Sequence, residues 1–137
     1  MSFLLDTNVV SELRKKSADE QVVAWAYALR KRDAFLGVVT IRELEAGVLL
    51  VERRDPTQGI LLRSWLDQTV LTAYVDRILP VDLDVARRAA ALHVPDPRPE
   101  RDALIAATAL VHGLTVATRN VADFEPMGVA VVNPWGQ

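Results

Sequence analysis

The sequence predicts an α/β fold built on a central, mainly parallel, five-stranded sheet. Five short apolar runs alternate with longer segments whose apolar residues recur at helical spacing. Parallel strands need long crossover connections, usually helical, and the intervening segments are long enough to supply them. The expected strands lie at residues 3–5, 35–39, 78–81, 114–117 and 129–132.

The expected helices lie between and around these strands, at residues 9–15, 18–32, 41–53, 57–75, 85–93 and 100–112. Pro56 and the charged residues before it separate the third helix from the fourth, which predicts a helical hairpin. The chain has 137 residues, half of them apolar, and no repeat or flexible linker. We therefore expect a single domain over residues 1–137.

The composition excludes several classes of protein. Without cysteine the chain has no disulfide framework, thiolate zinc site or cysteine nucleophile. The net charge of −2 argues against a broad surface that coats nucleic acid, so any such contact should be local. No apolar run is long enough for a membrane span, and the first residues lack the basic region of an export signal. We expect a cytoplasmic protein.

Four acidic residues stand where a parallel sheet places its ligands. Such sheets bind ligands outside the carboxyl ends of their strands. Asp6 directly follows the first strand, Glu43 lies just beyond the second, and Asp123 comes soon after the fourth. Asp102 lies in the first turn of the helix at 100–112, whose other residues are mostly apolar. The pattern suits one site for a hard cation, bound by oxygen atoms.

Each acid also has an explanation that needs no function. Asp6 fits a helix N-cap, and Thr40 with Glu43 fits a capping box. Asp102 favours a helix dipole, while Asp123 suits a turn or a short helix capped by Asn120. The case for a shared site therefore depends on the convergence of all four.

Carboxylates at close range repel one another unless a cation, protons or arginines compensate. A metal ion is the simplest compensation, and oxygen ligands without cysteine favour Mg²⁺ or Mn²⁺ over zinc. On its helix Glu43 shares a face with Ala46 and Gly47, which leaves space beside the carboxylate. Glu45 is expected to point with Arg42 and Glu52 toward solvent.

Four segments together resemble the PIN-domain family, specifically the VapC and FitB-like toxins of bacterial toxin–antitoxin pairs. They read LLDTNVVSE at 4–12, TIREL at 40–44, DALIAATA at 102–109 and ATRNVADF at 117–124. They occur in the family's order and span nearly the whole chain. The resemblance implies a PIN-like three-layer α/β/α fold.

The resemblance also implies the activity and the site. It implies a Mg²⁺- or Mn²⁺-dependent endoribonuclease that leaves a 5′-phosphate and a 3′-hydroxyl. The implied metal-binding and catalytic acids are Asp6, Glu43, Asp102 and Asp123, and the implied residues that orient ligands or substrate are Asn8, Thr118 and Asn120. The implied partners are a second copy of the chain and an antitoxin with a basic tail, in a larger complex on operator DNA.

Two other functions remain open from the residues. Phosphatases of the haloacid dehalogenase type also carry an acid after the first strand, but their Asp-x-Asp pattern fails at Asn8. A PIN module that only binds its antitoxin would use the same acids to receive an arginine. Metal-dependent cleavage of RNA would separate that module from an enzyme.

Overall fold

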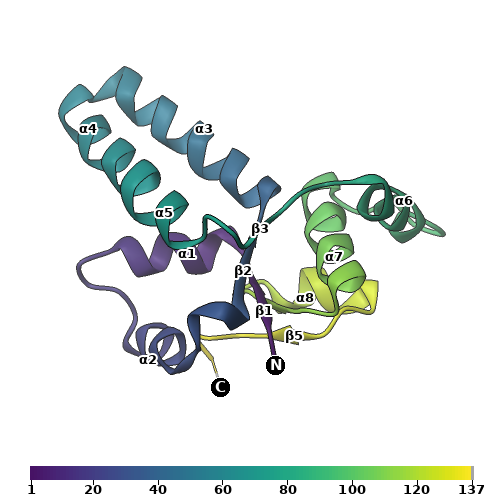
Figure 1. Cartoon of the computed structure of the whole chain (residues 1–137). Helices are drawn as coiled ribbons and strands as arrows, with labels where there is room; N and C mark the ends of the chain where they lie inside the picture. The colour runs from purple at the N-terminus through teal and green to yellow at the C-terminus, as the bar shows by residue number, and fades with distance from the viewer. Residues whose placement is uncertain (137) are drawn as a thin grey trace.

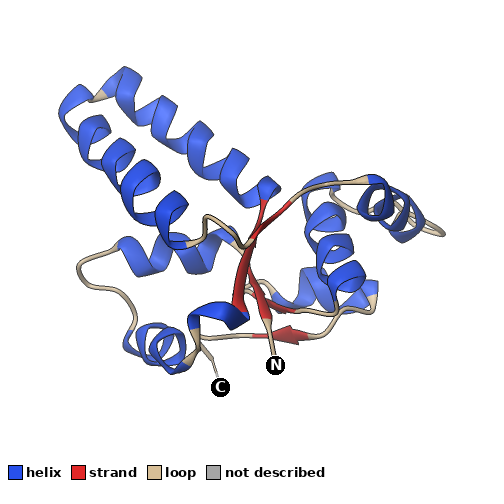
Figure 2. Ribbon diagram, in the orientation of Figure 1, coloured by secondary structure: helices blue, strands red, loops and turns tan. Residues whose placement is uncertain are grey.

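The structure, a computed structural model, describes residues 1–136 and confirms the predicted sheet (Figures 1 and 2). The five strands pair in the order β3-β2-β1-β4-β5, and every pairing is parallel. The strands are β1 (Phe3–Leu5), β2 (Ala34–Gly37), β3 (Ile78–Leu79), β4 (Thr115–Ala117) and β5 (Val131–Val132). The central position of β1 puts Asp6, the next residue, in the middle of the carboxyl edge.

Helices connect the strands, as predicted. The α-helices are α1 (Thr7–Arg14), α2 (Glu20–Ala28), α3 (Val38–Arg54), α4 (Pro56–Ser64), α5 (Leu71–Ala73), α6 (Leu83–Leu92), α7 (Glu100–His112) and α8 (Val121–Phe124). Two 3₁₀ turns lie at Lys31–Asp33 and Glu125–Met127, and a π-helical stretch at Trp65–Val70 joins α4 to α5.

Both faces of the sheet are covered, which gives the expected three layers. Strand β1 is buried along its whole length, and its side chains alternate between two cores. Phe3 and Leu5 pack with side chains of α1, α2 and α3, while Leu4 packs with α7 and α8. In Figure 1, α1 and α2 lie on one side of the sheet and α6 and α7 on the other.

Helix α3 begins earlier than its sequence indicates, and this corrects the expected second strand. Val38 and Val39 were expected in the strand because they continue the apolar run that begins at Phe35. They instead form the first turn of α3, with Gly37 as the N-cap residue. Val39 still packs against the core beside α7, so tertiary packing outweighs its intrinsic preference. Thr40 therefore lies inside the helix.

Capping aspartates fix the other helix starts that differ from expectation. Helix α2 begins at Glu20 rather than residue 18, because the Asp19 carboxylate accepts hydrogen bonds from two backbone amides of the first turn. The Asp55 carboxylate caps α4 by accepting a hydrogen bond from the backbone N–H of Gln58, with Pro56 as the first helical residue. The predicted helix at 57–75 is present, but it is interrupted by the π-helical stretch.

The predicted hairpin of α3 and α4 projects from the sheet in Figure 1. It carries exposed large apolar side chains, namely Leu49, Leu50, Ile60 and Leu61. Within residues 1–136, no helix combines the length and the hydropathy needed to cross a membrane.

Candidate metal-binding site

The fold brings three of the four predicted acids together at the carboxyl edge of the sheet. Asp6 follows β1, Glu43 lies in the second turn of α3, and Asp102 is the third residue of α7. All three bind the same arginine side chain, that of Arg101. They are far apart in the chain, so only the parallel arrangement of β1, β2 and β4 places them in contact.

Asp6 is both a helix cap and a member of this cluster. Its Oδ1 atom accepts a hydrogen bond from the backbone N–H of Thr7 at 2.7 Å, which caps α1. Its Oδ2 atom accepts from the Thr118 hydroxyl, also at 2.7 Å. The side chain is fully buried. The capping explanation for Asp6 is therefore correct, but it accounts for only part of the side chain's contacts.

Glu43 does not form the capping box that its spacing from Thr40 suggested. Thr40 is already the third residue of α3, so it cannot cap that helix. Glu43 instead points to the start of α1, where the Thr7 hydroxyl donates to Glu43 Oε1 at 2.5 Å. Thr40 contacts the same Thr7 hydroxyl at 3.1 Å. Thr7 thus holds Glu43 in place, a role that the sequence analysis missed.

Arg101 occupies the centre of the cluster and uses each of its three nitrogens on a different acid. Its Nη2 atom lies 2.5 Å from Asp6 Oδ1, Nε lies 2.7 Å from Glu43 Oε2, and Nη1 lies 2.8 Å from Asp102 Oδ1. Burial alone would lower the pKa of Arg101, but its bonds to Glu43, Asp6 and Asp102 outweigh burial and raise that pKa. The arginine is therefore a permanent cation.

Arginines were one of three expected means of relieving the repulsion between the acids, but Arg101 itself was not predicted. One signal was available. Arg101 lies in the first turn of α7, where the helix dipole disfavours a positive charge. A cation at such a position, next to an acid at the rim of a buried helix, indicates acidic partners from elsewhere in the fold.

The predicted polar neighbours lie around Asp6. Besides its bond to Asp6, Thr118 Oγ1 accepts a hydrogen bond from the backbone N–H of Asn120 at 3.0 Å. Asn8 Nδ2 lies 3.5 Å from the same oxygen, and Asn8 Oδ1 is buried without a hydrogen-bond partner in residues 1–136. A buried amide oxygen without a partner is costly in a protein, unless a ligand or water reaches it.

Asp123, the fourth predicted acid, lies apart from these contacts. It is exposed on the short helix α8, and its carboxylate makes no ion pair within the described residues. Its backbone N–H donates to the Asn120 carbonyl at 3.1 Å. Its role as a metal ligand stays a prediction.

The donor atoms suit a hard divalent cation, although Arg101 now holds them. Three carboxylates and the orphaned Asn8 Oδ1 are the oxygen ligands that Mg²⁺ and Mn²⁺ prefer. In the present arrangement, residues 1–136 contain no three acidic or histidine side chains grouped to hold a metal. The oxygen donors suit a divalent ion by their chemistry, but their present positions suit a guanidinium.

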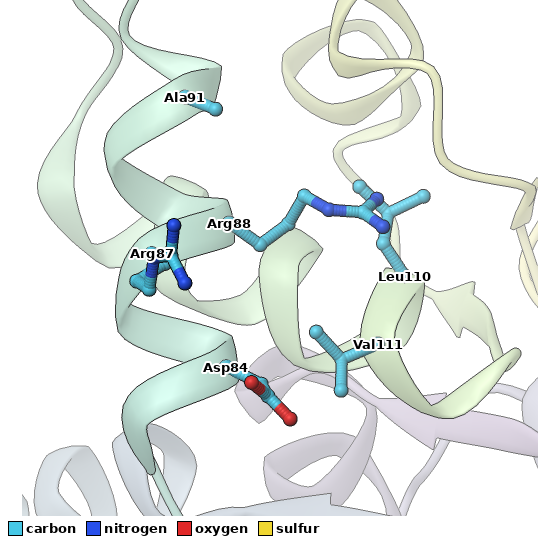
Figure 3. A pocket seen from close by; sticks show the side chains of 6 residues that line it. All are labelled: Asp84, Arg87, Arg88, Ala91, Leu110 and Val111. Atoms are coloured by element: carbon cyan, nitrogen blue, oxygen red, sulfur yellow. The ribbon is translucent and has the colours of Figure 1, made fainter.

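A hollow of about 460 Å³ lies elsewhere, between α6 and α7 (Figure 3). Its lining consists of Asp84, Arg87, Arg88, Ala91, Leu110 and Val111. None of these residues belongs to the acidic cluster.

Comparison with known proteins agrees with this fold. The PIN domain family matches residues 3–125. Toxin FitB of Neisseria gonorrhoeae is 41% identical over 138 aligned residues, which cover 96% of this chain and 97% of that protein. VapC ribonuclease Y4jK of Sinorhizobium fredii is 37% identical, with 96% of both chains covered.

Solved structures give the same result. A crystal structure of FitAcB from Neisseria gonorrhoeae has a TM-score of 0.91 and 38% identity, covering 98% of this chain and 99% of that one. A structure of FitAB bound to an IR36 DNA fragment also has a TM-score of 0.91, with 36% identity over 98% of this chain and 96% of that one.

The chain is a PIN domain. The family match and the parallel sheet both show this, and acids after β1 and from α3 and α7 lie at the carboxyl edge of that sheet. Within that class, the chain belongs to the VapC and FitB toxin family.

Proposed function

We propose that the protein is the toxin of a type II toxin–antitoxin pair and a Mg²⁺- or Mn²⁺-dependent endoribonuclease. The observation that carries this proposal is the meeting of Asp6, Glu43 and Asp102 in one cluster. Family membership supports it, since one relative is named a toxin and another a ribonuclease. The substrate is RNA, and the bond hydrolysed is a phosphodiester.

The acids of the cluster have two roles in the proposed reaction, ion binding and proton transfer. Asp6, Glu43 and Asp102 hold the divalent ion, with Asp123 as the fourth acid. The bound ion supplies positive charge that lowers the pKa of water and stabilises charge on the phosphate. A carboxylate of the cluster would accept the proton of the water that attacks phosphorus in line, while the bond to the 3′ oxygen breaks and that oxygen takes a proton from solvent.

The polar neighbours of these acids orient the reactants. The Thr118 and Thr7 hydroxyls donate to Asp6 and Glu43, which keeps both carboxylates in one orientation. Asn8 Oδ1 has no partner of its own in residues 1–136 and is free to accept a hydrogen bond from water or to bind the ion. Asn120, on the exposed side of Thr118, contacts the RNA.

The proposed protein partners follow from the relatives and from the charge of the site. A similar chain is solved as FitAB on a DNA fragment, so we propose an antitoxin and a larger complex on operator DNA. The acidic cluster accommodates a guanidinium, as Arg101 demonstrates, and a basic antitoxin tail would present the same chemistry. A homodimer would cover the exposed apolar side chains of the α3–α4 hairpin.

The test is cleavage of end-labelled RNA by the purified protein, with Mn²⁺, with Mg²⁺ and with chelator. We expect cleavage only with a divalent ion, and products with a 5′-phosphate. Asp6→Asn and Asp102→Asn should reduce the rate by ~100-fold or more, since the removed charges act directly on the reaction. Glu45→Gln should retain the parental rate, because Glu45 lies on α3 but outside the cluster. Equal cleavage by Asp6→Asn and the parent would refute the proposal.

One observation favours a second candidate, a PIN module that binds its antitoxin but has little catalysis. The acids already bind a guanidinium, so they can receive an arginine of another protein without any metal. The same assay decides between the two. A parent protein that forms the antitoxin complex, yet cleaves no RNA in either ion, would be the binding module.

A further inference from the structure

The three proposed metal-binding carboxylates already have a cation, the side chain of Arg101. We propose that Arg101 is an internal counter-ion that competes with the divalent cation for Asp6, Glu43 and Asp102. The ion then binds only in molecules whose Arg101 has withdrawn its guanidinium. This inference rests on the proposed function, because it assumes that these acids bind a divalent ion.

The first reason is that the carboxylate oxygens are already occupied. Contacts from Arg101, Thr7 and Thr118 engage five of the six oxygen atoms of the three acids. Mg²⁺ needs near-octahedral oxygens at roughly 2.0–2.1 Å from one point. Here the oxygens instead surround a planar guanidinium, one at each nitrogen. The two cations therefore require different arrangements of the same atoms.

The second reason is charge. Three carboxylates around a single guanidinium leave two negative charges uncompensated, which draws cations toward the cluster, although Arg101 still occupies the oxygens that would bind them. Withdrawal of Arg101 exposes the third negative charge and strengthens that attraction. The acids attract both the divalent ion and the guanidinium. Because both cations use the same carboxylates, binding of one opposes binding of the other.

The third reason is that Arg101 can leave. About one third of its side-chain surface is exposed, whereas Asp6 is fully buried. Arg101 is the second residue of α7, close to the positive end of the helix dipole, which does not favour an inward-pointing cation. The long side chain can therefore turn to solvent while the backbone of α7 stays packed.

The competition has a measurable consequence for affinity. When only a fraction of molecules can bind a ligand, the apparent dissociation constant is the intrinsic one divided by that fraction. If Arg101 is withdrawn in about one molecule in ten, removal of its side-chain charge should tighten ion binding about tenfold. Removal should also lower the melting temperature without metal, since the acids then repel one another.

The experiment measures Mn²⁺ binding by calorimetry and electron paramagnetic resonance in the parent, Arg101→Gln, Arg101→Lys and Arg42→Gln, each also melted with chelator and with Mn²⁺. Arg101→Gln should bind Mn²⁺ about tenfold more tightly and gain more melting temperature from it. Arg101→Lys should be intermediate, because one ammonium cannot span three carboxylates. Arg42 is exposed beside Glu43 and makes no ion pair within residues 1–136, so Arg42→Gln removes the same charge as a matched control.

Three results would overturn the inference. If Arg101→Gln binds Mn²⁺ as the parent does, or more weakly, Arg101 does not compete with the ion, while the proposed metal dependence stands. If Arg42→Gln tightens binding as much, the effect is general electrostatics. If neither the parent nor any variant binds Mn²⁺, both this inference and the proposed function fail. Should Arg101→Gln not fold, the comparison of Arg101→Lys with the parent decides.

Discussion

At the scale of single residues, Asp6 shows how one buried carboxylate serves structure and chemistry at once. It caps α1, accepts from Thr118 and binds Arg101. The sequence suggested acids that repel one another until a metal binds. In the structure Arg101 pairs with all three acids and relieves this repulsion, so removal of the Asp6 charge should not increase stability.

The stability of Asp6 variants tests this point. In chelator, Asp6→Asn should lose about 1.5–3 kcal/mol, the value of a hydrogen bond to a charged group. Asp6→Ala should lose ~0.5–2 kcal/mol more, because it also removes the cap of α1. Mn²⁺ should stabilise the parent by about 2.7 kcal/mol at roughly one hundred times its dissociation constant, and both variants less. Thermal melts with chelator and with Mn²⁺ measure this, and an equal Mn²⁺ gain in parent and variants would exclude Asp6 as a ligand.

Glu12 provides a prediction about pH. Its carboxylate accepts from the backbone N–H of Asp19 at 2.9 Å and from Lys15 Nζ at 3.0 Å. These two contacts, the first above all, lower the pKa of Glu12 below its ordinary 4.5. A lowered pKa in the folded state gives stability that is fully present above 4.5 and is lost as pH falls through the folded value.

Glu12→Gln should therefore be less stable than the parent at pH 7, and the difference should shrink steadily below pH 4.5. Urea unfolding of both proteins at a series of pH values measures the difference directly, because the other carboxylates titrate equally in both. A difference that stays constant from neutral to acid pH would show that the charge of Glu12 contributes nothing.

At the scale of elements, two glycines of the hairpin are expected to respond in opposite directions. A Cβ atom at Gly59 of α4 would lie 2.6 Å from the Cα atom of Glu52 in α3, so the two helices would have to separate. A Cβ atom at Gly47 of α3 would meet nothing within 4 Å. Of these two glycines, only Gly59 is needed for the close approach of α3 and α4.

Gly59→Ala should destabilise the protein by about 1–3 kcal/mol, as overpacking typically does. Gly47→Ala, the matched control, should stabilise it by ~0.5–1 kcal/mol through better helix propensity. Chemical denaturation of the two variants and the parent gives both values. Similar destabilisation by both substitutions would mean that the separation of α3 and α4 is not set at Gly59.

The orientation of α3 can be tested through two neighbouring acids. Glu43 faces the cluster, whereas Glu45 pairs with Arg63 of α4 at 2.6 Å. The Glu45 side chain is 40% exposed, so it lies on the solvent side of α3 as expected, with Arg63 as an unpredicted partner. Glu43→Gln should lose RNA cleavage and Glu45→Gln should keep it, measured per folded molecule. The reverse result would mean that α3 turns Glu45, rather than Glu43, toward the site.

Prediction from the sequence succeeded where a pattern is local and failed where a partner is distant. The buried strand at Phe3–Leu5 and the helix at Glu100–His112 have the predicted bounds, because apolar runs and helical spacing of apolar residues are local signals. The capping box was wrong, because the true partner of Glu43 is Thr7, 36 positions away. Arg101 lies 95 positions from Asp6, and no periodicity connects the two.

At the scale of the whole molecule, the topology of the sheet accounts for the composition of the site. Because β1 lies between β2 and β4, the segments after all three strands meet at one edge. Asp6 and Thr7 follow β1, Glu43 lies in the helix after β2, and Thr118 follows β4. Helix α7 packs against one face of the sheet and adds Asp102. This places the acids at the position where parallel α/β sheets usually bind their ligands.

The α3–α4 hairpin carries exposed apolar side chains, and we expect it to form a homodimer interface. Leu49 and Leu61 are 54% and 61% exposed, so their replacement by Glu should cost the isolated chain little. Within a dimer, the same charges would be buried without partners, which is unfavourable. Leu49→Glu with Leu61→Glu should therefore weaken dimerisation by at least about tenfold, or ~1.4 kcal/mol. Leu83→Glu is the control, since Leu83 is 72% exposed but lies on α6, outside the hairpin. Sedimentation velocity at micromolar concentration measures the change. A monomeric parent, or equal dissociation of the Leu83→Glu control, would show that the hairpin is not the interface.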